Sequence, residues 1–421
     1  MKLPATRNAP AMNSFVSPSR IPFAALAIAL ALSVPACADD WTQWRGPLGN
    51  GVAADAKLPS KLDAQSIAWT IDLPGRGLSS PIIVGERVFV SATSGVKQDR
   101  LHVLCFNLGD GSLRWERQFW ATGRTMTHEK IGGAAPTPVS DGQRIYAFYS
   151  SNDCVALDLE GNLVWFRGLG RDYPNASNSL GMSSSLVAAD GVVVAQVEND
   201  SESFTAGLDA KTGENRWKLD RPKKANWTSP TLMKGAGGKT LVALQSSKGL
   251  AGVDIITGAV IWNYGEGAST VPSTTVSDGK LYVPSNGLTV LEPGTEAAPK
   301  QIWRSAQLRP GTSSPLVLGN RVFTMNDGGI LSCGDAADGK RLWQLRLKGP
   351  FSSTPVAAGG FLYCVNEKGL LQVVDPSLPE GGVVSELELG QEVLGTPSIA
   401  AGSIFVRSDH KLWRIGRASA L

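Results

Sequence analysis

Histidine is the residue type that most often serves acid–base and metal chemistry near neutral pH, and the 421-residue chain contains three. His102 alternates with Leu101 and Val103 on a predicted strand, so we expect it to have a structural role. His410 lies in a polar turn. The chain has neither a G-x-S-x-G nucleophile elbow nor an H-E-x-x-H helix, so serine and zinc hydrolysis are not predicted.

The third histidine, His128, stands beside Glu129 and Lys130, just before one of the recurring strand openings described below. Arg221 and Trp227 hold the equivalent place two repeats later. Charged groups of both signs next to an indole would suit an anionic or peptide-like ligand. We therefore name these five residues as candidate ligand contacts at the mouth of a central channel. The alternative interpretation is that they are separate surface loop residues.

The cysteines show no spacing typical of a metal or redox site. Four of the five lie inside apolar runs, namely Cys105, Cys154, Cys333 and Cys364. No C-x-x-C motif and no adjacent pair occurs, so we predict that these four are buried and act as small hydrophobic residues. A disulfide between Cys333 and Cys364, in neighbouring repeats, is the alternative.

Acidic and basic residues do not gather into an obvious ion-binding or nucleic-acid-binding region. The run Glu198–Glu202 has oxygen ligands of the kind that calcium prefers, but a solvated hairpin loop is the simpler interpretation. The formal net charge is +3, and the charged residues are well mixed along the chain. Nucleic-acid binding would require clustered Lys and Arg residues and is not predicted.

The elements that must position these residues form a repeat, which recurs roughly every 40 to 55 residues from Leu78 onward. Each unit opens with a small-residue strand that usually carries proline. Six openings have this form: Ser79-Ser80-Pro81, Thr137-Pro138, Ser229-Pro230, Ser314-Pro315, Thr354-Pro355 and Thr396-Pro397. Two more are altered, at Ser183–Leu186 and Pro272–Thr275. The count of openings is therefore eight.

Within each unit, turn residues and a tryptophan recur at fixed places. Asp-Gly turns precede alternating strands, as at Asp141-Gly142, and a later strand ends at an Asp, as at Leu208-Asp209. In five units a Gly is followed four residues later by a Trp: Gly111–Trp115, Gly161–Trp165, Gly213–Trp217, Gly258–Trp262 and Gly339–Trp343. Trp303 holds this place without the Gly, and one unit has Val383–Ser385 instead. We expect these tryptophans to pack between adjacent sheets.

The last unit is incomplete, because the chain ends after the strand around Leu412–Ile415. A strand at Ile67–Ile71, which carries Trp69, is available upstream to complete it. We predict an all-β, eight-bladed propeller of four-stranded antiparallel blades, whose last blade is closed by this N-terminal strand. Seven blades would require the Pro272 unit to be misread.

The segment Gly207–Trp217 resembles the PQQ-type propeller repeat, and Asp40–Pro47 is similar to the leading motif of secreted bacterial PQQ-like, or BamB-like, proteins. This resemblance covers essentially residues 40 to 418. It implies the propeller fold, but one propeller hosts many functions. Relatives that bind the quinone PQQ pair adjacent cysteines and hold calcium with acidic and amide groups. This chain has no adjacent cysteine pair and no calcium set that we can assign, so neither PQQ nor calcium is predicted.

The N-terminus has the features of an export signal, with basic residues before the apolar run Ile21–Val34. Ala36-Cys37-Ala38 fits a cleavage site that removes residues 1–38, whereas Val34–Cys37 resembles a degenerate lipobox that would lipidate Cys37. We favour the soluble periplasmic or secreted form over an outer-membrane-anchored lipoprotein. Residues 40–66 would then lead into a propeller at 67–418. No other segment is long and apolar enough to span a membrane.

These features favour a non-catalytic, extracytoplasmic binding or scaffolding propeller with protein partners in the cell envelope. The resemblance to BamB-like proteins implies a part in envelope or outer-membrane protein assembly. The alternative function is that of a PQQ-dependent, quinoprotein dehydrogenase-type oxidoreductase.

Overall fold

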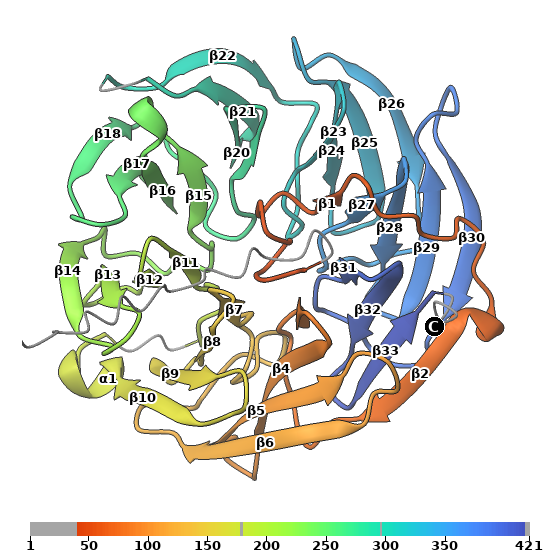
Figure 1. Cartoon of the computed structure of the whole chain (residues 1–421). Coiled ribbons are helices and arrows are strands. Elements are labelled where there is room, and N and C mark those ends of the chain that lie inside the picture. The colour runs from red at the N-terminus through yellow and green to blue at the C-terminus, as the bar shows by residue number, and fades with distance from the viewer. Residues whose placement is uncertain (1–39, 177–179, 295–296, 417–421) are drawn as a thin grey trace, which may run out of the picture. The chain divides into compact units, whose positions relative to one another are not determined.

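Eight four-stranded antiparallel sheets, one of which gains a short fifth strand in parallel, follow one another around a ring in the computed structural model (Figure 1). The model describes residues 40–176, 180–294 and 297–416, so the predicted signal region, Cys37 and residues 417–418 lie outside the described residues. The eight sheets confirm the predicted eight-bladed propeller. The alternative of seven blades is wrong, because the Pro272 unit forms a complete sheet.

Seven sheets each take their four strands in chain order. The first three comprise β3 (Ile82–Val84), β4 (Arg87–Ser94), β5 (Arg100–Asn107) and β6 (Leu113–Trp120); β7 (Val139–Ser140), β8 (Arg144–Phe148), β9 (Asp153–Asp158) and β10 (Leu163–Gly168); and β11 (Val187–Ala189), β12 (Val192–Val197), β13 (Phe204–Asp209) and β14 (Asn215–Asp220). The next two comprise β15 (Thr231–Lys234), β16 (Thr240–Ser246), β17 (Gly249–Asp254) and β18 (Val260–Tyr264); and β19 (Thr275–Ser277), β20 (Lys280–Ser285), β21 (Gly287–Glu292) and β22 (Lys300–Ser305). The sixth and seventh comprise β23 (Leu316–Leu318), β24 (Arg321–Met325), β25 (Ile330–Asp335) and β26 (Arg341–Arg346); and β27 (Val356–Ala358), β28 (Phe361–Val365), β29 (Leu370–Asp375) and β30 (Gly382–Glu388).

The eighth sheet joins the two ends of the described chain. It contains β31 (Ser398–Ala400), β32 (Ser403–Arg407) and β33 (Lys411–Ile415), and its outer strand is β2 (Ile67–Asp72). β2 pairs antiparallel with β33 and lies beside it in Figure 1. This pairing confirms closure of the last blade by an N-terminal strand, which leaves no unpaired edge between the chain's ends.

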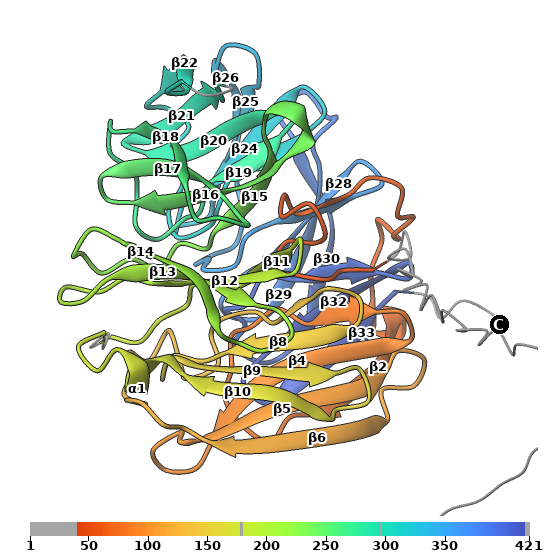
Figure 2. The ribbon, with the colours of Figure 1, turned by 60° about the vertical axis from the view of Figure 1, so that its left-hand side comes forward.

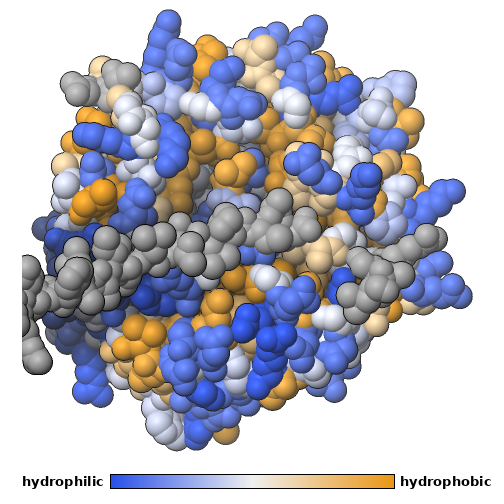
Figure 3. Space-filling view, in the orientation of Figure 1, coloured by the Kyte–Doolittle hydropathy of each residue, from blue (hydrophilic) through white to orange (hydrophobic). Residues whose placement is uncertain are grey.

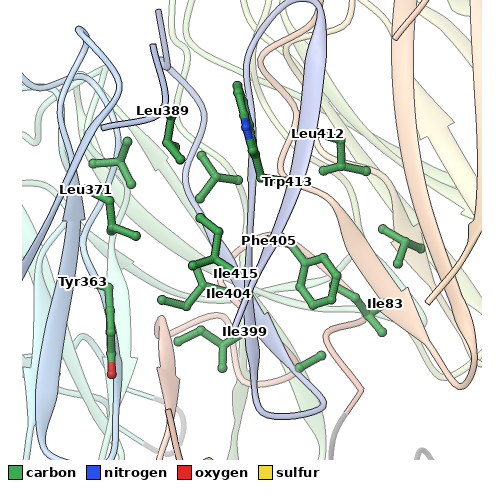
Figure 4. Packing of buried hydrophobic residues seen from close by; sticks show 14 of the residues in the cluster. Ile83, Tyr363, Leu371, Leu389, Ile399, Ile404, Phe405, Leu412, Trp413 and Ile415 are labelled. Carbon is green, nitrogen blue, oxygen red and sulfur yellow. The ribbon is translucent and has the colours of Figure 1, made fainter. Parts of the chain in front are cut away.

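Buried apolar residues fill the spaces between neighbouring sheets. The largest cluster lies around the eighth sheet and continues into the first and seventh sheets. Figure 4 shows Phe405 and Ile404 of β32 within this cluster, with Ile83 of the first sheet on one side and Tyr363 of the seventh on the other. The joint that closes the ring is therefore packed as a hydrophobic core. The short helices α1 (Leu169–Asp172), Ala64–Ser66 and Ala236–Gly238 lie in connections.

The tryptophans of the outer strands bond to the next sheet around the ring. Five of them donate the indole Nε1–H to a main-chain oxygen there: Trp69 to Leu108, Trp115 to Leu159, Trp165 to Ala210, Trp217 to Ile255 and Trp303 to Ala336, at 2.8–3.2 Å. Trp262 and Trp343 are buried in the same position, but their Nε1 atoms have no partner among the described residues. We call these seven residues the tryptophan belt.

The Gly-to-Trp spacing links neighbouring repeats rather than residues within one repeat. Gly213 has a φ of +75°, and a Cβ added there would lie 2.7 Å from the Trp165 ring of the preceding sheet. Gly161 and Gly258 lie in the same way against Trp115 and Trp217. Each such glycine is required because the turn needs a positive φ and because a bulky indole covers it.

Residues 41–53, which we call the plug, cross the ring instead of only leading into it. Trp41 pairs with Ile83 of the first sheet, whereas β1 (Val52–Ala53) pairs in parallel with β27 of the seventh. Between these contacts, Arg45 donates hydrogen bonds to the fifth and sixth sheets. Figure 2 shows this orange-red segment against the ring from a second direction. The plug was not predicted from the sequence.

Other predictions about single residues are also resolved. The four cysteines are buried and free, which confirms the predicted packing role and excludes the Cys333–Cys364 disulfide. His102 is buried between Glu116, whose Oε1 lies 2.5 Å from Nδ1, and Ser94, whose Oγ lies 2.7 Å from Nε2.

Among the described residues, no helix is long and apolar enough to cross a membrane. Hydrophilic and hydrophobic residues are interspersed on the face seen in Figure 3.

Candidate functional site

A cavity of about 520 Å³ lies at the centre of the ring. All eight sheets contribute to its wall, mainly through the segments that enter their first strands. The plug contributes Trp44. Because the plug contacts the opposite ends of several first strands, Trp44 forms the floor of the cavity and the entering segments surround its mouth.

Seven hydroxyl side chains form a ring in the wall, one from each sheet except the first. They are Thr137, Ser185, Ser229, Ser273, Ser314, Thr354 and Thr396, each two residues before the first strand of its sheet. Each hydroxyl oxygen accepts the main-chain N–H of the equivalent residue in the preceding sheet, beginning with the N–H of Ser80, at 2.9–3.2 Å. We call these seven residues the hydroxyl collar.

The collar hydroxyls keep one hydrogen each for another partner. A hydroxyl has one donor and two acceptor positions, and in each collar residue the main-chain N–H occupies one acceptor position. Within the described ranges, none of the seven hydroxyls donates to a protein acceptor. The cavity wall is therefore rich in free O–H donors at one level.

The collar is interrupted where the eighth sheet meets the first. Ser80 would supply the eighth hydroxyl, but its Oγ is buried and has no partner among the described residues. Other bonds hold this joint, since Ser398 Oγ donates to the main-chain oxygen of Pro81 at 2.5 Å. Arg407 Nη1 donates to Ser79 Oγ at 3.0 Å. The closing joint thus differs from the other seven in its central contacts.

The charged groups of the wall lie at the mouth. Lys130 Nζ is 3.0 Å from Glu367 Oε2, and the hydrogen bond to this carboxylate raises the pKa of Lys130. Glu367 also accepts the hydroxyl of Ser352 at 2.6 Å. Asp327 accepts the main-chain N–H of Thr312. The one cation among the lining residues is therefore paired.

Of the five predicted ligand contacts, the structure places two in the cavity wall. Lys130 lines the mouth, and so does Trp227, whose Nε1 donates to the main-chain oxygen of Gly181 at 3.0 Å. His128 and Glu129 are exposed and lie outside the lining. Direct ligand contact by Lys130 and Trp227 stays a prediction.

Arg221 is placed elsewhere, which corrects its predicted position at the mouth. Its Nε lies 2.6 Å from Glu198 Oε1, and the side chains of Arg221 and Glu198 are 6% and 1% exposed. Arg221 Nη2 also donates to main-chain oxygens of Leu244 and Gln245 in the next sheet. Arg221 therefore joins two sheets and is not available to a ligand.

The acidic run Glu198–Glu202 is only partly the solvated loop that we expected. Glu198 and Asn199 are buried, whereas Asp200 is exposed. Burial raises the pKa of Glu198, although Arg221 and Asn226 act in the opposite direction. The loop interpretation fails at Glu198 because sequence spacing did not reveal its partner, Arg221, 23 residues away.

Comparison with known proteins supports the same architecture. The family model described as outer membrane protein assembly factor BamB matches residues 52–181, 175–290 and 284–378. The chain belongs to this family. The PQQ-like propeller repeat inferred from the sequence is thereby confirmed.

Proteins with two different kinds of name resemble this BamB-family chain. A polyvinylalcohol dehydrogenase from Sphingopyxis sp. (strain 113P3) is 25% identical over 274 residues, which cover 53% of the chain and 39% of that protein. A BamB from Moranella endobia (strain PCIT) is 25% identical over 175 residues, which cover 40% of each protein. The matched stretches thus span about two fifths of the length of both curated relatives.

Solved structures of both kinds share the fold. BamB from Moraxella catarrhalis superposes with a TM-score of 0.63 at 15% identity, covering 84% of this chain and 98% of that one. The quinohemoprotein alcohol dehydrogenase from Comamonas testosteroni has a TM-score of 0.65 at 12% identity, covering 91% of this chain and 81% of that one. At these identities the likeness shows the fold alone.

The residues that line the central cavity can be compared with the residues that would be needed to bind PQQ and calcium. Among the described residues, no group of three or more His, Cys, Asp or Glu could hold a metal ion. The four buried cysteines lie outside the cavity lining. These residues do not fit the paired cysteines and calcium ligands that the resemblance implies for PQQ-binding relatives.

The hydroxyl collar is the part of the site that sequence reasoning missed. Its residues were visible as the Ser-Pro and Thr-Pro openings, which mark the start of each repeat. Their periodicity predicts the strand starts but does not by itself indicate a binding role. The additional signal was chemical, because every opening places a hydroxyl at the same position, including the two altered openings at Ser185 and Ser273.

Proposed function

We propose that the chain is a non-catalytic binding or scaffolding propeller that acts outside the cytoplasm on protein partners of the cell envelope. The observation that carries this proposal is the chemistry of the cavity wall. Its polar groups are mostly hydroxyls that already connect the sheets and retain free donors. Hydroxyls without an adjacent base, such as those of the collar, are weak nucleophiles, so this part of the wall suits recognition better than covalent chemistry.

The finer proposal is a part in outer-membrane protein assembly, in the periplasm or on the outer membrane. It is supported by the family match and by the BamB relatives. The export signal that the sequence predicts in residues 1–38 agrees with this proposal. Mass spectrometry of the mature N-terminus distinguishes the soluble form that we favour, which begins after Ala38, from a chain lipidated at Cys37.

Affinity purification from the envelope fraction after mild cross-linking tests the proposal. The wild-type chain should retain specific proteins, and Trp227→Ala, in the cavity wall, should lose most of them. Trp120→Ala is the matched control, because Trp120 is exposed at the end of β6 and lies outside the cavity. Equal capture by both variants would contradict a partner site at the cavity mouth.

A PQQ-dependent dehydrogenase is the second candidate function. The similarity to the polyvinylalcohol dehydrogenase and to the quinohemoprotein alcohol dehydrogenase favours it. It predicts dye reduction with alcohols after the purified chain is incubated with saturating PQQ and calcium. Absence of dye reduction under these conditions would remove this candidate, and we expect that absence because the wall offers no calcium set.

A further inference from the structure

Two buried arginines lie next to the hydroxyl collar without bonding to any carboxylate. Arg45, in the plug, is fully buried and donates through Nη2 to Thr275 Oγ1 at 2.7 Å and to the main-chain oxygen of Pro315 at 2.6 Å. Thr275 lies two residues after the collar residue Ser273, and Pro315 directly follows the collar residue Ser314. The Nε and Nη1 atoms of Arg45 are buried and have no partner among the described residues.

Arg407 lies behind another part of the wall, at the closing joint. Its Nη1 donates to Ser91 O at 2.6 Å as well as to Ser79, and its buried Nη2 has no partner among the described residues. Arg407 packs behind Gly395, a residue of the cavity lining. The nearby Asp409 bonds to Arg76 and to the main-chain N–H of Gly77 rather than to Arg407, although its charge opposes part of the effect of burial on Arg407.

Each of these arginines places a positive charge behind the inner wall of the cavity. Burial lowers the pKa of Arg45 to about 9, and burial lowers that of Arg407 to about 10, so both groups remain charged at neutral pH. Transfer of an unpaired charge into the protein interior is costly unless an opposite charge compensates it. The acids of the lining, Glu367 and Asp327, lie at the mouth and not at the collar.

We propose that the hydroxyl collar binds the carboxylate group of a ligand that enters the cavity from its mouth. A carboxylate only accepts hydrogen bonds, and the collar offers O–H donors whose oxygens are already engaged by main-chain N–H groups. Hydrogen bonds from these donors to a charged acceptor are stronger than neutral ones, and Arg45 and Arg407 add favourable potential from behind the wall.

The carboxylate can come from two sources, the C-terminus of a protein chain or a small organic acid. The first source deepens the proposed function, on which it rests, because it specifies which part of a protein partner the cavity would hold. Trp227, Phe351 and Val271 line the same cavity and would contact the apolar part of either ligand.

Equilibrium dialysis with quantitative mass spectrometry tests this proposal on the full-length mature chain. The probes are one pool of N-acetylated hexapeptides prepared as free acids and as C-terminal amides, with acetate and benzoate as small acids. We expect at least tenfold enrichment of the free acids over the amides if the source is a chain terminus. Binding of benzoate or acetate alone would support the carboxylate site and assign it to small acids.

Thr354→Val removes one collar hydroxyl with little change of shape and should weaken carboxylate binding roughly tenfold, the effect of one hydrogen bond to a charged group. Thr205→Val is the matched control, because Thr205 is a buried β13 residue that does not line the cavity and whose hydroxyl has no partner among the described residues. It should leave binding unchanged.

Equal binding of acids and amides, together with no binding of benzoate or acetate, would overturn the proposal, and this comparison needs no variant to fold. If wild-type chain still captured envelope proteins through Trp227 in that case, the carboxylate site would fail while the proposed function stood. If the chain neither distinguished acids from amides nor captured envelope proteins through Trp227, both the carboxylate site and the proposed function would be contradicted.

Discussion

The hydroxyl collar and the tryptophan belt are two periodic rings in one molecule, and they use their polar groups differently. Each belt indole has one N–H donor, and five of the seven donate it to the next sheet. Each collar hydroxyl also contacts a neighbouring sheet, but as an acceptor, and its own hydrogen stays free at the cavity. The belt is therefore devoted to stability, whereas the collar combines stability with a capacity to bind.

This difference shows that repetition alone does not separate structural from functional residues. Each ring has one member in seven of the eight repeats, and both rings join neighbouring sheets. What separates them is whether any hydrogen-bonding capacity remains after the fold has formed, and whether it faces a cavity. The following four changes test that distinction.

Loss of a belt tryptophan should have the largest effect. Trp217→Ala removes a side chain that is 8% exposed, deletes its bond to Ile255 and uncovers Gly258, so the free energy of unfolding should fall by about 3–5 kcal/mol. Trp120→Ala is the control, because Trp120 is 62% exposed, and it should cost less than about 1 kcal/mol. Chemical denaturation measures both, and equal losses would contradict the assignment of the belt.

Loss of a collar hydroxyl should have a smaller effect on stability. Thr354→Val leaves the main-chain N–H of Ser314 buried without its acceptor, which should cost about 1–3 kcal/mol. The variant should remain folded by circular dichroism, so that its binding can be measured. A loss as large as that of Trp217→Ala would mean that the collar is primarily structural.

Removal of a hydroxyl that bonds to nothing should act in the opposite direction. Thr205 is fully buried, and its Oγ1 has no partner among the described residues. Thr205→Val replaces this polar group with a methyl group of similar size, so the free energy of unfolding should rise by up to about 1 kcal/mol. A marked loss of stability in the same denaturation assay would contradict the assignment of Thr205 as a residue whose hydroxyl does not stabilise the fold.

The smallest effect is expected at the turns that carry the belt glycines. Asp209 pairs with Arg216 and accepts main-chain N–H groups of Lys211 and Thr212, and these contacts lower its pKa. A lowered folded-state pKa means that Asp209 stabilises the fold above about pH 4 and loses this contribution as the pH falls through the folded value. Asp209→Asn should therefore cost about 0.5 kcal/mol at pH 7.

The pH dependence of Asp209→Asn provides its own control. The difference in thermal stability between wild type and variant should shrink as the pH is lowered from 7 to 3. A difference that is constant across this range would show that the charge of Asp209 has no part in holding the turn.

The sequence predicted the periodic parts of the fold because their contacts repeat. The blade count, the closing strand with Trp69 and the position of the belt all follow from local spacing and are found in the structure. The plug was missed because it does not repeat, and its contacts are distant in sequence. Arg45, for example, bonds to Thr275, 230 residues away.

The candidate site was predicted less well for a related physical reason. Equivalent positions in a repeat share a backbone environment but not a side-chain direction, so Trp227 reaches the cavity while Arg221 turns into a buried ion pair. The collar residues were recognised as strand openings, but their free donors became visible only when the ring had been assembled. Spacing therefore located the elements, and the closed ring decided which side chains face inward.

Site-specific photo-cross-linking in cells that produce the full-length chain tests the central claim most directly. A photoreactive amino acid replaces Val271, which lines the cavity mouth and is 41% exposed, or Leu342 of the outer strand β26, which is 46% exposed. If the cavity face binds a protein partner, position 271 should yield discrete cross-linked proteins and position 342 should not. Cross-linking that is equal at the two positions, or absent at 271, would contradict this account.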